Sequence, residues 1–298
     1  MAEHHAHHRH THADALGSGA ALRAAAALTL GFAAIEAIGG WWTGSLALLS
    51  DAGHMVTDGA ALALGALAAW VARRPPSARH SYGLGRAEIF AALVNAAAML
   101  VIVALLGYEA IARLQEPATV KGGAAAAIAL AGLALNVVIL RRLAPHGHDM
   151  NTRAARLHVL GDALGSVAAL IAGLTIALGG WPGIDPVASL VICLLIAASA
   201  MRLTRESVHA LMEGVPLGLS MEAIGREMAS VEGVLSVHDL HVWMLSGSRV
   251  ALSAHVVVGS LVQWERTLQI LQQRLREKFR IDHVTLQPEL GARPLVRH

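Results

Sequence analysis

Six long apolar runs constrain the fold of this chain more than any other feature of its sequence. A run of about 20 apolar residues is long enough to cross the hydrocarbon core of a bilayer as a helix. Backbone polar groups have no water to bond there, so a spanning segment of this length must be helical. The sequence therefore predicts an all-α six-helix transmembrane bundle, with spans at 22–42, 46–72, 87–114, 122–143, 152–178 and 184–203.

The composition indicates a membrane protein that carries a soluble part. Hydrophobic residues make up 55% of the chain and charged residues 15%, which is unlike an ordinary soluble protein. We divide the chain into a polar tail at 1–18, expected to be disordered, a transmembrane domain at 19–206 and a cytoplasmic domain at 207–298. Arginines cluster in the loops after the second and fourth spans, which predicts that both termini are cytoplasmic.

The last ninety residues alternate between helix and strand patterns. Ser220 can cap a helix that ends near Ser230, and Ser260 can cap a second helix that ends near Phe279. The β-branched and apolar stretches at 234–245 and 249–258 flank Ser-Gly-Ser and predict a hairpin, and 281–287 predicts a third strand. The order αββαβ predicts an α+β domain, a three-stranded sheet with two helices on one face.

Two predicted spans contain the same polar motif, His-x-x-x-Asp. His54 and Asp58 lie in one copy, and His158 and Asp162 lie in the other. Residues four apart share one face of a helix, so two such helices can supply four nitrogen and oxygen ligands, which suit tetrahedral Zn²⁺. A single motif could be an ordinary pair on a helix surface. Two copies inside a bilayer would lack solvent to offset their desolvation and favour an ion site.

Other polar residues in the spans leave two interpretations open. Glu36, Asn95 and Asn136 could line an ion path or join a hydrogen-bond network between helices, and the network is favoured. Asp51 lies two helical turns before Asp58. It could be a carboxylate at the entrance or exit of the path, or a solvated residue near a helix end.

The polar tail is rich in histidine. Such tracts bind Zn²⁺, Ni²⁺ or Cu²⁺ weakly and can raise the local metal concentration near a pore. A tail without an essential role explains the composition equally well. The residues that could collect metal are His4, His5, His7, His8, His10 and His12.

The motifs and their surroundings resemble the cation diffusion facilitator family of zinc and divalent-metal efflux transporters. Besides His-x-x-x-Asp, the segments that carry the resemblance are 44–51, 79–88, 185–186, 211–214 and 237–243. The resemblance implies a metallochaperone-like cytoplasmic domain, a homodimer, and a transport site made of the four motif residues.

The resemblance also implies a second metal site in the cytoplasmic domain. His238 and His255 match two zinc ligands there, and Glu289 matches the position of a third. Gln287 stands where some relatives have another histidine, which argues against a two-metal cluster. Arg86 and Glu213 match a charge pair that links the membrane part to the cytoplasmic domain in the resembling proteins.

We expect a Zn²⁺ efflux transporter in a bacterial inner membrane that works by alternating access in exchange for protons. Cd²⁺, Co²⁺, Ni²⁺ and Fe²⁺ remain alternative substrates, and the expected partners are lipid, protons and a second copy of the chain, without nucleic acid. Protonation of an imidazole competes with metal binding, which couples the two ions.

Four ligands leave no open position for catalysis, so no enzyme is expected. A membrane metal sensor or a metallohydrolase is the alternative, although the His-Glu-x-x-His motif typical of the latter is missing from the sequence.

Overall fold

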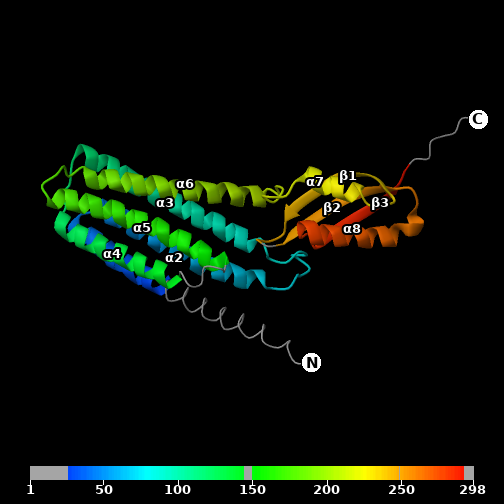
Figure 1. Cartoon of the computed structure of the whole chain (residues 1–298), viewed down its shortest axis with the longest axis horizontal. Helices are drawn as coiled ribbons and strands as arrows, with labels where there is room; N and C mark the ends of the chain where they lie inside the picture. The colour runs from blue at the N-terminus through cyan, green and yellow to red at the C-terminus, as the bar shows by residue number, and fades with distance from the viewer. Residues whose placement is uncertain (1–25, 144–149, 248, 292–298) are drawn as a thin grey trace, which may run out of the picture. The chain divides into compact units, whose positions relative to one another are not determined.

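The computed structural model describes residues 26–143, 150–247 and 249–291. Within these ranges, five helices are long and apolar enough to cross a membrane. They lie side by side in Figure 1 and are α2 (Leu46–Ala72), α3 (Ala87–Gln115), α4 (Gly122–Leu143), α5 (Met150–Ala177) and α6 (Ile184–Leu211). Residues 26–43 are also helical, so the first predicted span is a helix over the residues that are described.

The helix ends agree with the predicted spans except at the end of α6. This helix runs to Leu211, eight residues beyond the predicted end at Leu203. The added turns lie beyond the apolar run, and Oε1 of Glu206 in them contacts Nε of Arg202 at 2.8 Å as an i,i+4 pair. Apolar length therefore marks the segment that can lie in lipid, but it underestimates the length of the helix.

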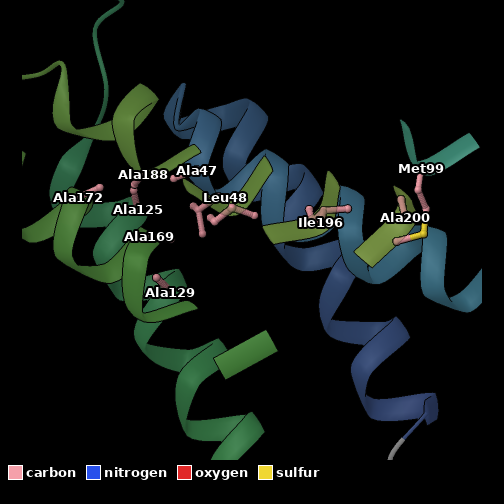
Figure 2. Packing of buried hydrophobic residues seen from close by; sticks show 11 residues of the cluster. Ala47, Leu48, Met99, Ala125, Ala129, Ala169, Ala172, Ala188, Ile196 and Ala200 are labelled. Carbon is pink, nitrogen blue, oxygen red and sulfur yellow. The ribbon is translucent and has the colours of Figure 1, made fainter. Parts of the chain in front are cut away.

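The described residues form two compact units, one within 1–63 and 95–201 and the other within 64–94 and 202–298. The first unit has a core of mostly small side chains, shown in Figure 2, to which α2 to α6 all contribute. Larger side chains such as Leu62, Leu105 and Leu194 are more than half exposed on its outside. This arrangement suits lipid, which solvates an apolar exterior and leaves close packing to small residues.

Glycines bring α4 and α5 into close contact. A Cβ at Gly173 would lie 2.6 Å from the backbone nitrogen of Ala126, and one at Gly122 would lie 2.7 Å from that of Ala177. Any larger residue would therefore force the two backbones apart. This packing holds α5, which carries His158 and Asp162, tightly against its neighbour.

The second unit contains the predicted α+β domain. Its elements are α7 (Met221–Ala229), β1 (Val234–Met244), β2 (Val250–Val258), the 3₁₀ turn η2 (Leu261–Gln263), α8 (Trp264–Phe279) and β3 (His283–Leu290). The sheet order is β1-β2-β3, with β1 antiparallel and β3 parallel to β2. The predicted order αββαβ is confirmed.

Both helices of this domain pack on one side of the sheet, as predicted. Ile224 of α7 and Leu271 of α8 are fully buried in one cluster with Leu252 and Val256 of β2. The Ser220 hydroxyl accepts a hydrogen bond from the backbone N–H of Ala223 and caps α7. Apolar residues of both helices and all three strands therefore share one core.

The bounds of the last helix and of the last strand differ from the prediction. Ser260 caps the short turn η2, which leads into α8, instead of capping α8 directly. The last strand begins at His283 and not at Ile281, which is fully buried in the core cluster ahead of the strand. It ends at Leu290 instead of Gln287, so it includes Glu289.

Candidate metal centre

The two His-x-x-x-Asp motifs meet between α2 and α5. Nε2 of His158 lies 3.3 Å from Oδ2 of Asp58, and Nε2 of His54 lies 3.7 Å from Oδ1 of Asp162. Within each helix, Nδ1 of His54 lies 3.4 Å from Asp58, and Nε2 of His158 lies 3.8 Å from Asp162. One ligand atom from each of the four side chains lies within 4.8 Å of all the others.

These spacings fit a shared cation better than hydrogen bonds. A charged N–H···O bond is about 2.7–2.9 Å long, shorter than each of the four separations. Ligands about 2.0–2.2 Å from a tetrahedral Zn²⁺ lie roughly 3.3–3.6 Å from one another. The observed distances of 3.3–3.8 Å are near that range, with His54 facing Asp58 through Nδ1 and Asp162 through Nε2. The four side chains are therefore close enough together to share one cation.

Burial makes this centre selective for positive charge. The Asp162 side chain has no exposed surface, and neither of its carboxylate oxygens has a hydrogen-bond partner within the described ranges. Oδ2 of Asp58 and Nδ1 of His54 are likewise buried without a partner. Buried carboxylates without donors are costly unless a cation offsets them. The His158 side chain is 44% exposed and gives the centre its most open side.

Buried polar residues continue from the metal centre toward the start of α2. The Ser166 hydroxyl donates to Oδ2 of Asp51 at 3.2 Å, and Nδ2 of Asn136 donates to Ser166 Oγ at 3.4 Å. Asp51 is only 1% exposed, so it is not a solvated residue at a helix end. Asn136 joins a hydrogen-bond network between helices, the interpretation favoured from the sequence. Asn95 instead makes a contact within α3, from Nδ2 to Met99 Sδ at 3.6 Å.

Two contributors to this region were missed in the sequence analysis. Ser166 follows Asp162 by four residues, so helical spacing would have placed it on the same face of α5. Asp185 is fully buried and accepts hydrogen bonds from Ser45 Oγ at 2.5 Å and from the backbone N–H of Leu46 at 2.6 Å. It thus caps the start of α2 from a neighbouring helix, and no local pattern at Ser45 indicates this.

Strand register explains how the histidines of the α+β domain come together. His238 of β1 pairs directly with His255 of β2, and their ring centroids are 5.3 Å apart. Gln287 of β3 pairs with His255, and Glu289 follows two residues later on the same face. Glu289 Oε1 contacts His255 Nδ1 at 2.7 Å, and Oε2 contacts His238 Nε2 at 2.9 Å.

These contacts create a second cluster of potential metal ligands, made of three residues. Hydrogen bonds from His238 and then His255 hold the pKa of the Glu289 carboxyl below its ordinary value of 4.5. The carboxylate is therefore ionised and aimed at both imidazoles. His238, His255 and Glu289 offer ligand atoms that lie within 4.8 Å of one another, and Gln287 does not belong to the group.

The charge pair and the tail histidines are the predicted residues that remain. Nη2 of Arg86 lies 2.9 Å from Oε1 of Glu213, so the predicted charge pair forms within the second unit. Both side chains are well exposed, and such a pair contributes about 0–1 kcal/mol to stability. The tail histidines lie outside the described residues.

Comparison with known families accounts for nearly the whole chain. The family model for the cation efflux transmembrane domain matches residues 5–212, and the model for the cytoplasmic domain of cation efflux proteins matches residues 216–290. The chain belongs to the cation efflux family. The resemblance to the cation diffusion facilitators is thereby confirmed, and the protein is a multi-pass membrane protein.

Several members of the family are similar over most of their length. Zinc transporter ZitB from Escherichia coli (strain K12) is 44% identical, over 88% of this chain and 84% of its own. The cadmium, cobalt and zinc/H(+)-K(+) antiporter of Bacillus velezensis is 37% identical over 96% and 92%. The metal cation efflux system protein CzcD of Cupriavidus metallidurans is 36% identical over 95% and 90%.

Proposed function

We propose that this protein exports Zn²⁺ in exchange for protons and binds the ion at His54, Asp58, His158 and Asp162. The observation that carries the proposal is the four-residue centre between α2 and α5, in which one ligand atom from each side chain lies within 4.8 Å of the others. Relatives named as zinc transporters and as a cadmium, cobalt and zinc antiporter support it. Cd²⁺ and Co²⁺ are the next candidates for substrates.

Proton exchange follows from the chemistry of the ligands. A metal needs the free imidazole nitrogen, so a proton on His54 or His158 removes a ligand, and metal binding in turn expels that proton. Release of the ion leaves two buried carboxylates without a cation, and protons then neutralise the centre. A proton gradient across the membrane can thereby favour release of the metal on the more acidic side.

Alternating access requires that α2 and α5, which carry the ligands, move so that the site opens to each side of the membrane in turn. His158 is the most exposed of the four side chains and Asp162 has no exposed surface, so we propose that the ion enters and leaves past His158. We propose that the protein works as a homodimer, in keeping with the match to the cytoplasmic domain model. The Arg-rich loops favour cytoplasmic termini in a bacterial inner membrane.

The cluster of His238, His255 and Glu289 is proposed as a regulatory zinc site. It lies in the cytoplasmic domain and is formed by strands that do not cross the membrane. Zinc there would bias the conformation of the domain without passing through it.

Reconstitution into sealed vesicles tests the proposal. Vesicles with an imposed pH gradient should accumulate zinc against its concentration gradient. The internal pH should change in step with the movement of zinc. A metal sensor or a membrane metallohydrolase would bind zinc in the same preparation but would not move it. Zinc binding without gradient-dependent transport would therefore contradict the proposal.

A further inference from the structure

Glu36 lies on the helical segment 26–43 and is fully buried in the first unit. Neither of its carboxylate oxygens has a hydrogen-bond partner within the part of the chain that is described. A Cβ added to Gly132 of α4 would lie 2.8 Å from Oε1 of Glu36. The carboxyl group therefore points into the bundle toward α4, at a place where the missing side chain of Gly132 leaves room for it.

A row of buried polar groups begins on α4, one helical turn from Gly132, and leads toward the metal centre. Asn136 lies one helical turn after Gly132 and donates to Ser166, which donates to Asp51. Oδ1 of Asp51 is buried without a partner among the described residues and lies against Gly165. Asparagine and serine thus connect Asp51 to the helix that faces Glu36, and both acidic side chains keep oxygens without a hydrogen-bond partner in the described residues.

The row ends one helical turn from the proposed zinc ligands. Asp51 precedes His54 by three residues on α2, and Ser166 follows Asp162 by four residues on α5. At 1.5 Å per residue, these offsets are about 4.5 and 6 Å along the helix axes. A divalent ion at the centre is therefore near enough to act electrostatically on the row through a medium that screens poorly.

The chemistry of the row favours protons over a second metal ion. The charged groups that act on Glu36 are the carboxylates of Asp51 and Asp162, and α4 presents Gly132 and Asn136 to this region. An ion pair between Glu36 and a lysine or arginine does not occur in the described residues. Glu36 and Asp51 also fall outside both groups of potential metal ligands found there.

We propose that Glu36 is a proton-binding residue of the transport cycle, linked to the metal centre through Asn136, Ser166 and Asp51. This inference rests on the proposed function and specifies where part of the counter-transported charge resides. With the centre empty, Glu36 holds a proton because an ionised carboxylate there has neither donor nor cation. When a divalent ion binds, its charge favours the carboxylate, and Glu36–COOH becomes Glu36–COO⁻ with release of one proton.

Calorimetric titration of the purified full-length protein with zinc chloride tests this assignment. Repeating the titration in buffers of different ionisation enthalpy gives the number of protons released per zinc bound. Glu36→Gln should retain the wild-type number of zinc ions per chain and release about one proton fewer per zinc. Glu36→Asp keeps a carboxyl and should recover most of that release. The matched control is Glu116→Gln, an exposed glutamate outside the row that should release as many protons as wild type.

Two outcomes would overturn the assignment. Equal proton release by wild type and Glu36→Gln would show that the proton resides elsewhere. A second measurement needs only the wild type. Infrared difference spectra on zinc addition should show the loss of a protonated carboxyl band. An unchanged band overturns the assignment even if Glu36→Gln fails to fold. Failure of wild type to bind zinc would instead contradict the proposed function, and Asp162→Asn, which removes a proposed ligand, should lose zinc binding in the same titration.

Discussion

Nε2 of His158 lies 3.3 Å from Oδ2 of Asp58, although the two residues are a hundred positions apart in the chain. The reciprocal contact, from Nε2 of His54 to Oδ1 of Asp162, measures 3.7 Å. Each aspartate therefore contacts the histidine of the other helix as well as the histidine of its own helix. The centre is shared between α2 and α5, so a single substitution affects both halves of it.

Replacing either aspartate should abolish zinc transport and leave the protein folded. Asp58→Asn and Asp162→Asn each remove a ligand charge, and the affinity should fall by more than the roughly 10–100-fold that loss of an outer-shell partner costs. The fold should persist because the change also removes a buried charge without a donor. Zinc uptake by vesicles and thermal unfolding in detergent measure the two effects, with Glu116→Gln as the matched control. Near wild-type uptake by either variant would mean that the four-ligand centre is wrong.

The cap of α2 by Asp185 predicts a change in stability. In Asp185→Ala, the buried N–H of Leu46 and the Ser45 hydroxyl lose their acceptor. An unsatisfied buried donor costs about 1–3 kcal/mol. Asp185→Asn keeps one oxygen and should lose less. Thermal unfolding in detergent should rank wild type above Asn and Asn above Ala; equal melting temperatures for all three would show that the cap contributes nothing.

Helix bounds and helix faces could be predicted from the sequence, but contacts between helices could not. Apolar length placed α2 and α4 at their observed bounds, and i,i+4 spacing placed each histidine on the same face as its aspartate. Local periodicity does not report which helices become neighbours. The pairing of Asp185 with Ser45, 140 residues apart, was therefore out of reach. Ser166 was missed for a different reason, since an isolated serine in an apolar helix most often bonds its own backbone.

In the cytoplasmic domain, His238→Ala or His255→Ala should weaken zinc binding without abolishing transport by the full chain. Each variant removes one of three clustered ligands, while the proposed transport site lies in the helices. Calorimetry on the fragment 207–298 measures the binding, since every residue of that domain's core cluster lies within it. His241→Ala is a suitable control because His241 lies on the same strand but outside the cluster. A wild-type fragment that binds no zinc would exclude the site.

Glu289 gives the same fragment a characteristic acid response in the absence of zinc. Its pKa is lowered on folding, so its contribution to stability is complete above the ordinary value of 4.5 and disappears as the pH falls through the lowered value. Glu289→Gln should therefore be less stable than wild type at neutral pH, and the difference should shrink below pH 4.5. Denaturant unfolding across that range measures it, and a difference independent of pH would contradict the hydrogen bonds to His238 and His255.

The identity of residue 54 should decide which metals the protein prefers. Imidazole is a borderline ligand of fixed geometry that suits tetrahedral Zn²⁺, whereas a carboxylate binds through one or two oxygens and accepts larger ions. His54→Asp would place a third carboxylate beside Asp58 and Asp162, which should strengthen the attraction for any divalent cation. We expect this variant to retain zinc transport and to gain cadmium transport.

The same substitution should weaken the pH dependence of metal binding near neutrality. With His54 replaced, His158 is the one imidazole left in the four-residue centre to compete for protons. Competition between zinc and cadmium in vesicles, measured for both proteins between about pH 6 and 8, tests both expectations. His158→Asp is the matched variant, because it makes the same exchange on α5 and at the more exposed side of the centre. If His54→Asp keeps the wild-type preference for zinc, the packing of α2 against α5 sets selectivity, and the type of ligand at position 54 does not.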